Sequence, residues 1–171
     1  MCCYKTIIPI FLSIIIIIVI ILIAIFTITP QTTANNLQAI KTLNNVQSSA
    51  GGSIPITFDN NRVQNGNAIT HSEGSSEISL TESGTYLVNF SLTGSLEIGL
   101  DPTLFFVSLY QDNIIVPGST TTSLIIPSGQ ESTISNSALI QINGNSTISL
   151  IATSVSDIIY VDASISVIKI A

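Results

Sequence analysis

Charged side chains are scarce in this sequence. Only 8% of its 171 residues are charged, compared with about 25% in an average soluble domain. The four Lys and Arg residues are scattered, and the formal net charge is −6. Nucleic-acid binding needs a basic patch, so this composition excludes it. Anionic lipid attracts cations, so the composition also disfavours docking on an anionic membrane surface.

Residues that build catalytic and metal sites are almost absent. The two cysteines, Cys2 and Cys3, lie at the N-terminus, and His71 is the single histidine. A zinc site needs more Cys or His ligands than a single histidine can supply. In a Ser-His-Asp triad the histidine must be held by a carboxylate beside a nucleophilic serine. Asp59 and the Asp157–Asp162 segment offer oxygen donors but lack the spacing of a calcium-binding loop. We therefore expect no catalytic residue, no metal and no cofactor.

One long apolar run is present near the N-terminus. Ile7–Ile28 has 22 residues without a charge, and as a helix it would span about 33 Å, enough to cross a bilayer. Lys5 precedes the run and the next cation is Lys41, so the N-terminus is expected in the cytoplasm and the rest outside. Residues 1–29 are thus predicted to be a cytoplasmic tip and membrane anchor.

Two questions about this anchor stay open. A cleaved signal peptide, which would make the protein secreted, has a shorter apolar core and a small-residue cleavage site, of which Thr32–Ala34 is a weak version. Cys2 and Cys3 are either acylated beside the membrane or free thiols without a role. Neither alternative changes the expectation for the outer domain.

Residues 30–53 are predicted to be a polar stalk. The segment is rich in Gln, Thr, Asn and Ala, and Ser48–Ser53 resembles a flexible joint. Apolar residues recur in it every three positions, from Leu37 to Val46. That stripe would suit a short oligomerising helix, although it is under two heptads long.

From residue 54 to 171 the pattern is that of short strands separated by Gly, Pro and Asn, about ten residues apart, with no helical period between them. Such a pattern predicts an all-β antiparallel sandwich or barrel of nine or ten strands. The turn at Gln111–Asn113 is one of several turn signals, and Asn143-Gly144 is a strong hairpin signal between Thr133–Ile142 and Ser146–Thr153.

Apolar positions divide these strands into two groups. In Thr81–Thr93 one face is apolar, which predicts that it fills the core of the subunit; its residues are Tyr86, Val88, Phe90 and Leu92. Other strands are apolar on both faces, which indicates burial against another chain. The residues predicted for that interface are Leu104, Phe106, Tyr110, Leu139, Ile151, Ile159 and Val161.

Four segments carry a family resemblance: Ile54–Asn60, Ser83–Tyr86, Phe106–Ser119 and Ala163–Ile170. Together they resemble the C-terminal domain of bacterial collagen-like surface glycoproteins, in the tumour necrosis factor and complement globular-head superfamily. The resemblance implies a ten-stranded antiparallel jelly roll that assembles as a homotrimer. Because Leu104–Tyr110 is apolar on both faces, we expect this strand near the threefold axis. No Gly-X-Y collagen stalk is present.

These observations predict a non-catalytic, membrane-anchored surface protein whose trimeric outer domain is structural or adhesive. The alternative is a trimeric ligand that binds a receptor or a glycan. Asn145 and Asn89 lie in Asn-x-Ser/Thr sequons and are candidate glycosylation sites if the source cell glycosylates asparagine.

Overall fold

The computed structural model describes residues 16–18, 34–42, 46–49, 51–96, 101–126 and 131–171. It divides the chain into two compact units, Met1–Thr32 and Thr33–Ala171. The strands of the second unit are β1 (Asn36–Lys41), β2 (Gln47–Ser48), β3 (Ser53–Pro55), β4 (Asn60–Asn65), β5 (Ile69–His71), β6 (Glu77–Leu80), β7 (Gly84–Ser95), β8 (Thr103–Gln111), β9 (Ile114–Ile115), β10 (Thr121–Ile125), β11 (Glu131–Ile142), β12 (Ser146–Ser154) and β13 (Ile159–Lys169).

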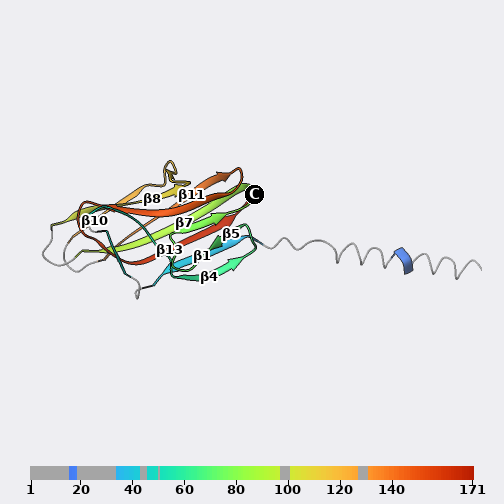
Figure 1. Ribbon diagram of the computed structural model, residues 1–171, viewed down its shortest axis with the longest axis horizontal. Coiled ribbons are helices and arrows are strands. Elements are labelled where there is room, and N and C mark those ends of the chain that lie inside the picture. Colours follow the sequence, from blue (N-terminus) through green and yellow to red (C-terminus); the bar gives the residue numbers. More distant parts are fainter. Residues whose placement is uncertain (1–15, 19–33, 43–45, 50, 97–100, 127–130) are drawn as a thin grey trace, which may run out of the picture. The chain divides into compact units, whose positions relative to one another are not determined.

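The strands form two antiparallel sheets that stack as a sandwich (Figure 1). The first, which we call sheet A, has the order β11-β7-β13-β1-β4, and the second, sheet B, has the order β10-β8-β12-β6-β5. Three short strands lie off these paths: β2 pairs with β13, β3 with β12 and β9 with β8. The described residues of this unit thus form the expected all-β antiparallel sandwich, with six strands in one sheet and seven in the other.

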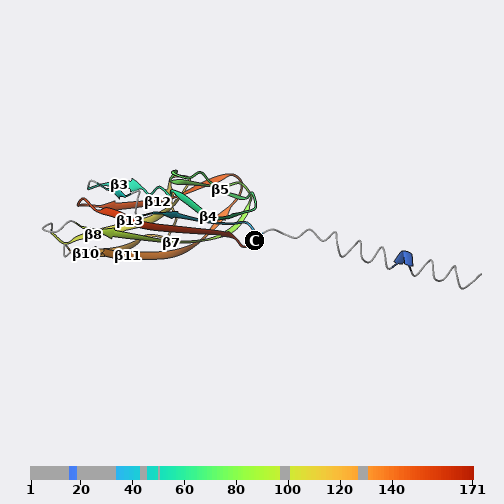
Figure 2. The ribbon, with the colours of Figure 1, turned by 90° about the horizontal axis from the view of Figure 1, so that it is seen from below.

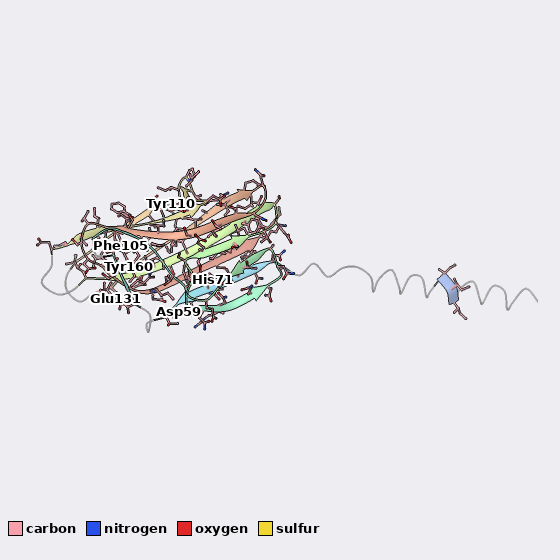
Figure 3. The ribbon with its side chains drawn as sticks, in the orientation of Figure 1. Asp59, His71, Phe105, Tyr110, Glu131 and Tyr160 are labelled. Atoms are coloured by element: carbon pink, nitrogen blue, oxygen red, sulfur yellow. The ribbon has the colours of Figure 1, made fainter. Side chains whose placement is uncertain are left out.

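The core lies between the two sheets and is built by period-two alternation. The four side chains that we assign to the subunit core, Tyr86, Val88, Phe90 and Leu92, are all buried. Phe105 of sheet B meets Tyr160 of sheet A, with ring centroids 6.4 Å apart (Figure 3). All 29 buried apolar residues of the described chain belong to the Thr33–Ala171 unit. That unit therefore holds a core of its own.

The predicted stalk differs from the structure. Asn36–Lys41 is a strand inside sheet A, paired with β13 on one side and β4 on the other. Leu37, Ala39 and Lys41 are its buried face. The sequence hides this alternation because a lysine occupies one of the inward positions. The sandwich therefore begins before residue 54, and the three-residue stripe does not form a helix at Leu37 or Ile40.

Two local predictions also need correction. Asn143-Gly144 does not close a hairpin, because β11 pairs with β7 in sheet A and β12 pairs with β6 and β8 in sheet B. The turn instead carries the chain from one sheet to the other. The sequence favours separate final strands at Asp157–Asp162 and Ser164–Ile170, but Ile159–Lys169 forms the single strand β13, whose register with β7 shifts between Tyr160 and Asp162. The shift lies at Val161, where the apolar run breaks period two.

In Figure 2 the long strands of both sheets run lengthwise along the sandwich: β7, β11 and β13 in sheet A, and β8 and β12 in sheet B. Little of the first unit is described: Ile16–Ile18 is helical, and the rest of Ile7–Ile28 lies outside the described residues. Within the part of the chain that is described, we find no helix with the length and apolarity needed to cross a membrane.

Candidate interaction surface

The outer face of sheet A is mostly uncharged and polar. Its strand registers place side chains in rows across the sheet, and Ser137, Asn89, Ser166 and Gln38 form one such row. The hydroxyl groups on this face bond to one another across strands, as in the 2.8 Å contact between the Ser91 and Ser164 oxygens. Such a face has little affinity for ions and can be desolvated at a modest cost.

One row of the same face is apolar. Leu139 on the edge strand β11, Leu87 on β7 and Ile168 on β13 lie side by side in register. Leu139 is 64% exposed, whereas Leu87 and Ile168 are half-buried. These three side chains form an apolar stripe that reaches the free edge of the sheet.

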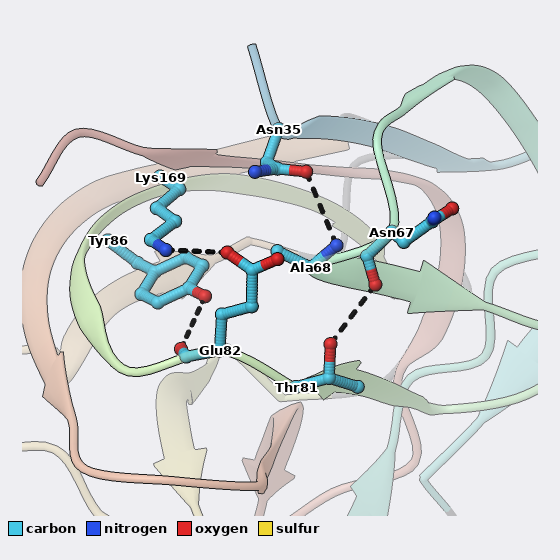
Figure 4. Close-up of polar contacts among 7 residues, drawn as sticks. All are labelled: Asn35, Asn67, Ala68, Thr81, Glu82, Tyr86 and Lys169. Atoms are coloured by element: carbon cyan, nitrogen blue, oxygen red, sulfur yellow. Dashed lines mark hydrogen bonds and ion pairs between the residues drawn. The ribbon is translucent and has the colours of Figure 1, made fainter. Parts of the chain in front are cut away.

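A polar network fixes the end of the sandwich beside this row (Figure 4). Lys169 Nζ forms an ion pair with Glu82 Oε2 at 2.6 Å. The Tyr86 hydroxyl donates to the Glu82 carbonyl at 2.7 Å, and the Ala68 N–H donates to Asn35 Oδ1 at 3.3 Å. Tyr86 directly precedes Leu87 on β7, and Lys169 directly follows Ile168 on β13. The network therefore holds the ends of these two strands together.

A groove of about 400 Å³ lies at the edge of sheet A, between β11 and the β8–β9 hairpin. Ile114 and Ile115 of β9 line it together with Leu139, and Ile114 is 73% exposed. Asp112 and Asn113 form the tight hairpin turn, and both have positive φ (49° and 65°), as a type I′ turn requires. We call Leu139, Leu87, Ile168, Ile114 and Ile115 the apolar band.

Asp112 anchors this hairpin to the start of strand β12. The Thr147 N–H and the Ser146 hydroxyl each donate to its carboxylate at 2.8 Å. The backbone hydrogen bond from Thr147, followed by the hydroxyl bond from Ser146, lowers the pKa of Asp112. The carboxylate is therefore ionised and firmly held at neutral pH, which positions Ile114 and Ile115.

The outer face of sheet B is also uncharged at its centre. Strands β8, β10 and β12 contain no charged residue. Leu104 and Leu124 stand opposite each other in register and are 46% and 52% exposed. Further along the sheet, Phe106, Tyr110 and Ile151 are half-buried and point outward. We call these five residues the β8 face.

The seven residues predicted for one interface do not lie on one surface. Leu104, Phe106, Tyr110 and Ile151 belong to the outer face of sheet B, whereas Leu139, Ile159 and Val161 belong to sheet A. The period of a strand indicates which residues share its face, but it does not tell which sheet the strand joins. Sequence reasoning missed Ile114, Ile115, Leu87 and Ile168; Leu87 could have been found, because it breaks the polar outer face of its strand.

The two sequon asparagines lie in different settings. Asn145 is exposed, next to a hollow of about 300 Å³ that Asp112 also lines. Asn89 is half-buried in the middle of the outer face of sheet A, opposite Ser137 and Ser166. A glycan on Asn145 would project away from the sandwich, whereas one on Asn89 would cover the face of sheet A.

The single histidine and a buried lysine are structural in their contacts. The His71 ring is buried, with Nδ1 2.6 Å from Asn61 Oδ1 and Nε2 3.1 Å from the Ser75 carbonyl oxygen. Lys41 is fully buried, and desolvation lowers its pKa although the nearby Asp59 carboxylate opposes the shift. Among the described residues, no group of three His, Cys, Asp or Glu side chains is arranged to hold a metal ion.

Comparison with known structures identifies the fold. The chain is similar to murine APRIL, in a crystal structure at pH 8.5, with a TM-score of 0.58 and 8% identity over 81% of this chain and 100% of that one. It is similar to the globular domain of zebrafish complement 1qA protein, with a TM-score of 0.55 and 11% identity over 80% and 98% of the two chains. The fold is the tumour necrosis factor/C1q-like jelly roll. No family model matches the sequence, and no curated protein does.

Proposed function

We propose that this chain is a non-catalytic surface protein whose jelly-roll domain assembles as a homotrimer with a structural or adhesive role. The observation that carries the proposal is the apolar band, which runs from the outer face of sheet A over its free edge to the β9 hairpin. Large exposed apolar side chains gathered in this way are typical of a protein contact.

The geometry of the band favours a ring. Leu87 and Ile168 lie on the face of sheet A and Leu139 lies at its edge, whereas Ile114 lines the same groove from the β9 hairpin of sheet B. A contact in which the edge of one copy packs on the face of the next is heterologous, and it closes into a ring when the rotation permits. Three copies are the number that the resemblance to the tumour necrosis factor superfamily implies.

The setting of the domain belongs to the proposal as well. Ile7–Ile28 is proposed to anchor the chain in a membrane with its N-terminus inside the cell, so that the jelly roll is displayed outside. A membrane anchor departs from the collagen-like surface glycoproteins, whereas an N-terminal anchor followed by a jelly roll is the layout of tumour necrosis factor-type ligands. Protease added to intact cells should then digest the jelly roll, and complete protection of it would contradict the orientation.

A trimeric ligand is the second candidate function. The hollow lined by Asp112, Asn145 and Thr147 offers polar groups to a receptor or glycan. A glycan array and a pull-down with the purified trimer separate the two roles. A saturable partner supports the ligand role, and self-association without one supports the structural role.

Leu139→Ser tests the trimer at its proposed contact. Because Leu139 is 64% exposed in the single chain, the substitution should leave the fold intact while weakening trimer formation at least tenfold. Val155→Ser is the matched control, since Val155 is 81% exposed and lies outside the band. Light scattering over a dilution series of the Thr33–Ala171 unit measures both. Equal effects of the two substitutions would contradict the assignment of the band.

A further inference from the structure

The β8 face has three properties that matter together. It is apolar, it is free of charge, and it lies on sheet B, whereas the apolar row of the band and its free edge belong to sheet A. The band reaches sheet B only through β9, where Ile115 pairs in register with Tyr110. A trimer built through the apolar band would therefore meet the β8 face at Tyr110 and leave its Leu104–Leu124 end exposed. Exposed apolar side chains clustered in this way are unusual on a protein that has no partner for them.

Several hydroxyl groups around the β8 face are already bonded within the chain. The hydroxyls of Ser108 and Thr120 bond to each other at 2.8 Å. Those of Ser53 and Thr153 do the same at 2.8 Å. The Thr122 hydroxyl donates to the Phe105 carbonyl at 3.0 Å. Covering hydroxyls that are already paired costs less desolvation than covering free ones.

Charge restricts what can cover this face. The Thr33–Ala171 unit carries three cations and ten carboxylates, a net charge of −7 with histidine neutral. Two copies that meet through charged surfaces would repel each other, whereas a neutral face avoids this repulsion. A twofold contact also sets each residue against the same patch of its partner, so the patch must be self-complementary. A neutral apolar face meets that requirement.

We propose that the β8 face binds the β8 face of a second copy, back to back, and so links one trimer to another. From Leu104 to Tyr110 the strand extends about 20 Å, and the three charge-free strands span about 15 Å in width. The contact would bury about 300 Å² on each copy, well under the roughly 800 Å² per partner of a stable interface. A single contact is therefore weak.

Three such faces per trimer turn a weak contact into a network. Linked copies of one weak site bind with an avidity that far exceeds the affinity of each site. On a surface where trimers are held close together, the β8 faces would join them into a layer. This layer rests on the proposed homotrimer, whereas the pairwise contact between two β8 faces does not.

The test is sedimentation velocity of the Thr33–Ala171 unit over a wide concentration range. Wild type should pass from trimers to pairs of trimers as the concentration rises. Leu104→Ser combined with Leu124→Ser removes two side chains that are about half exposed, so the fold should persist while the trimer–trimer association weakens at least tenfold. Val155→Ser should behave as wild type.

The other outcomes are distinguishable. If no trimer forms but the chain dimerises, and the double substitution abolishes the dimer, the β8 contact stands and the homotrimer fails. If the double substitution breaks the trimer itself, the β8 face belongs to the ring and the back-to-back contact is overturned. Wild type that never exceeds a trimer, or that sediments with neutral phosphatidylcholine vesicles instead, also overturns it.

Discussion

Replacing Lys41 with methionine should stabilise the domain, although most substitutions in a core do the reverse. The side chain of Lys41 is 0% exposed, and its Nζ has no hydrogen-bond partner in the described part of the chain. Leaving a buried polar group unsatisfied costs about 1–3 kcal/mol. Methionine has a similar length and carries no charge. We expect Lys41→Met to raise the free energy of unfolding by about 2 kcal/mol, or Tm by about 6–10 °C.

The stability gained by Lys41→Met should decrease as the pH rises. Because desolvation lowers the pKa of Lys41 in the folded chain, the unfolded chain holds this proton to higher pH. Wild-type stability therefore increases as the pH rises from the lowered pKa toward the unfolded value of about 10.4. The advantage of Lys41→Met over wild type should shrink over that interval and be largest at neutral pH.

Urea unfolding followed by circular dichroism between pH 7 and pH 10 measures this difference. Lys169→Met is the control, because Lys169 is partly exposed and pairs with Glu82; an exposed ion pair contributes little, so this substitution should not raise the stability. A Lys41→Met variant less stable than wild type at pH 7 would refute the reasoning, since the ammonium would then have stabilising contacts.

Two further predictions concern glycine positions and the Asp112 turn. A Cβ at Gly84 would lie 2.1 Å from the backbone oxygen of Ala171, whereas Gly74 has open space around it and φ of +85°. In urea unfolding, Gly84→Ala should therefore lower the free energy of unfolding by well above the roughly 1–2 kcal/mol expected for Gly74→Ala. Equal losses of stability would contradict the close packing of the C-terminus. The hydrogen bond from Thr147 lowers the pKa of Asp112, so wild type should lose stability as the pH falls below about 4, through that lowered pKa. The Asp112→Asn variant should be less stable than wild type at pH 7, and its stability should change less as the pH falls. Acid unfolding curves that run parallel for the variant and wild type would count against this anchor.

The sandwich was predictable because most strands follow period two with apolar residues inward, as β7 does. Strand β1 was not, because Lys41 occupies an inward position and breaks the apolar pattern. Strand β4 has no apolar alternation either, since Asn60–Asn65 is a polar edge strand that owes its place to pairing with β1. Neither strand could be recognised from its own side chains, because each forms only by pairing with strands that lie elsewhere in the sequence.

The candidate surface was harder to predict than the core. Alternation shows that Leu104 and Leu139 face away from the core, but not that they lie on different sheets. The Asn143-Gly144 turn contributed to this difficulty, because an apparent hairpin connects the two sheets. The apolar band also joins residues from β7, β9, β11 and β13, and only the strand order brings them together.

The mass of the Thr33–Ala171 unit in solution tests the central claim most directly. Native mass spectrometry or light scattering should give three chains per particle at micromolar concentration, and Leu139→Ser should shift the particles toward single chains. A monodisperse monomer, or a trimer that Leu139→Ser leaves unchanged, would contradict the account.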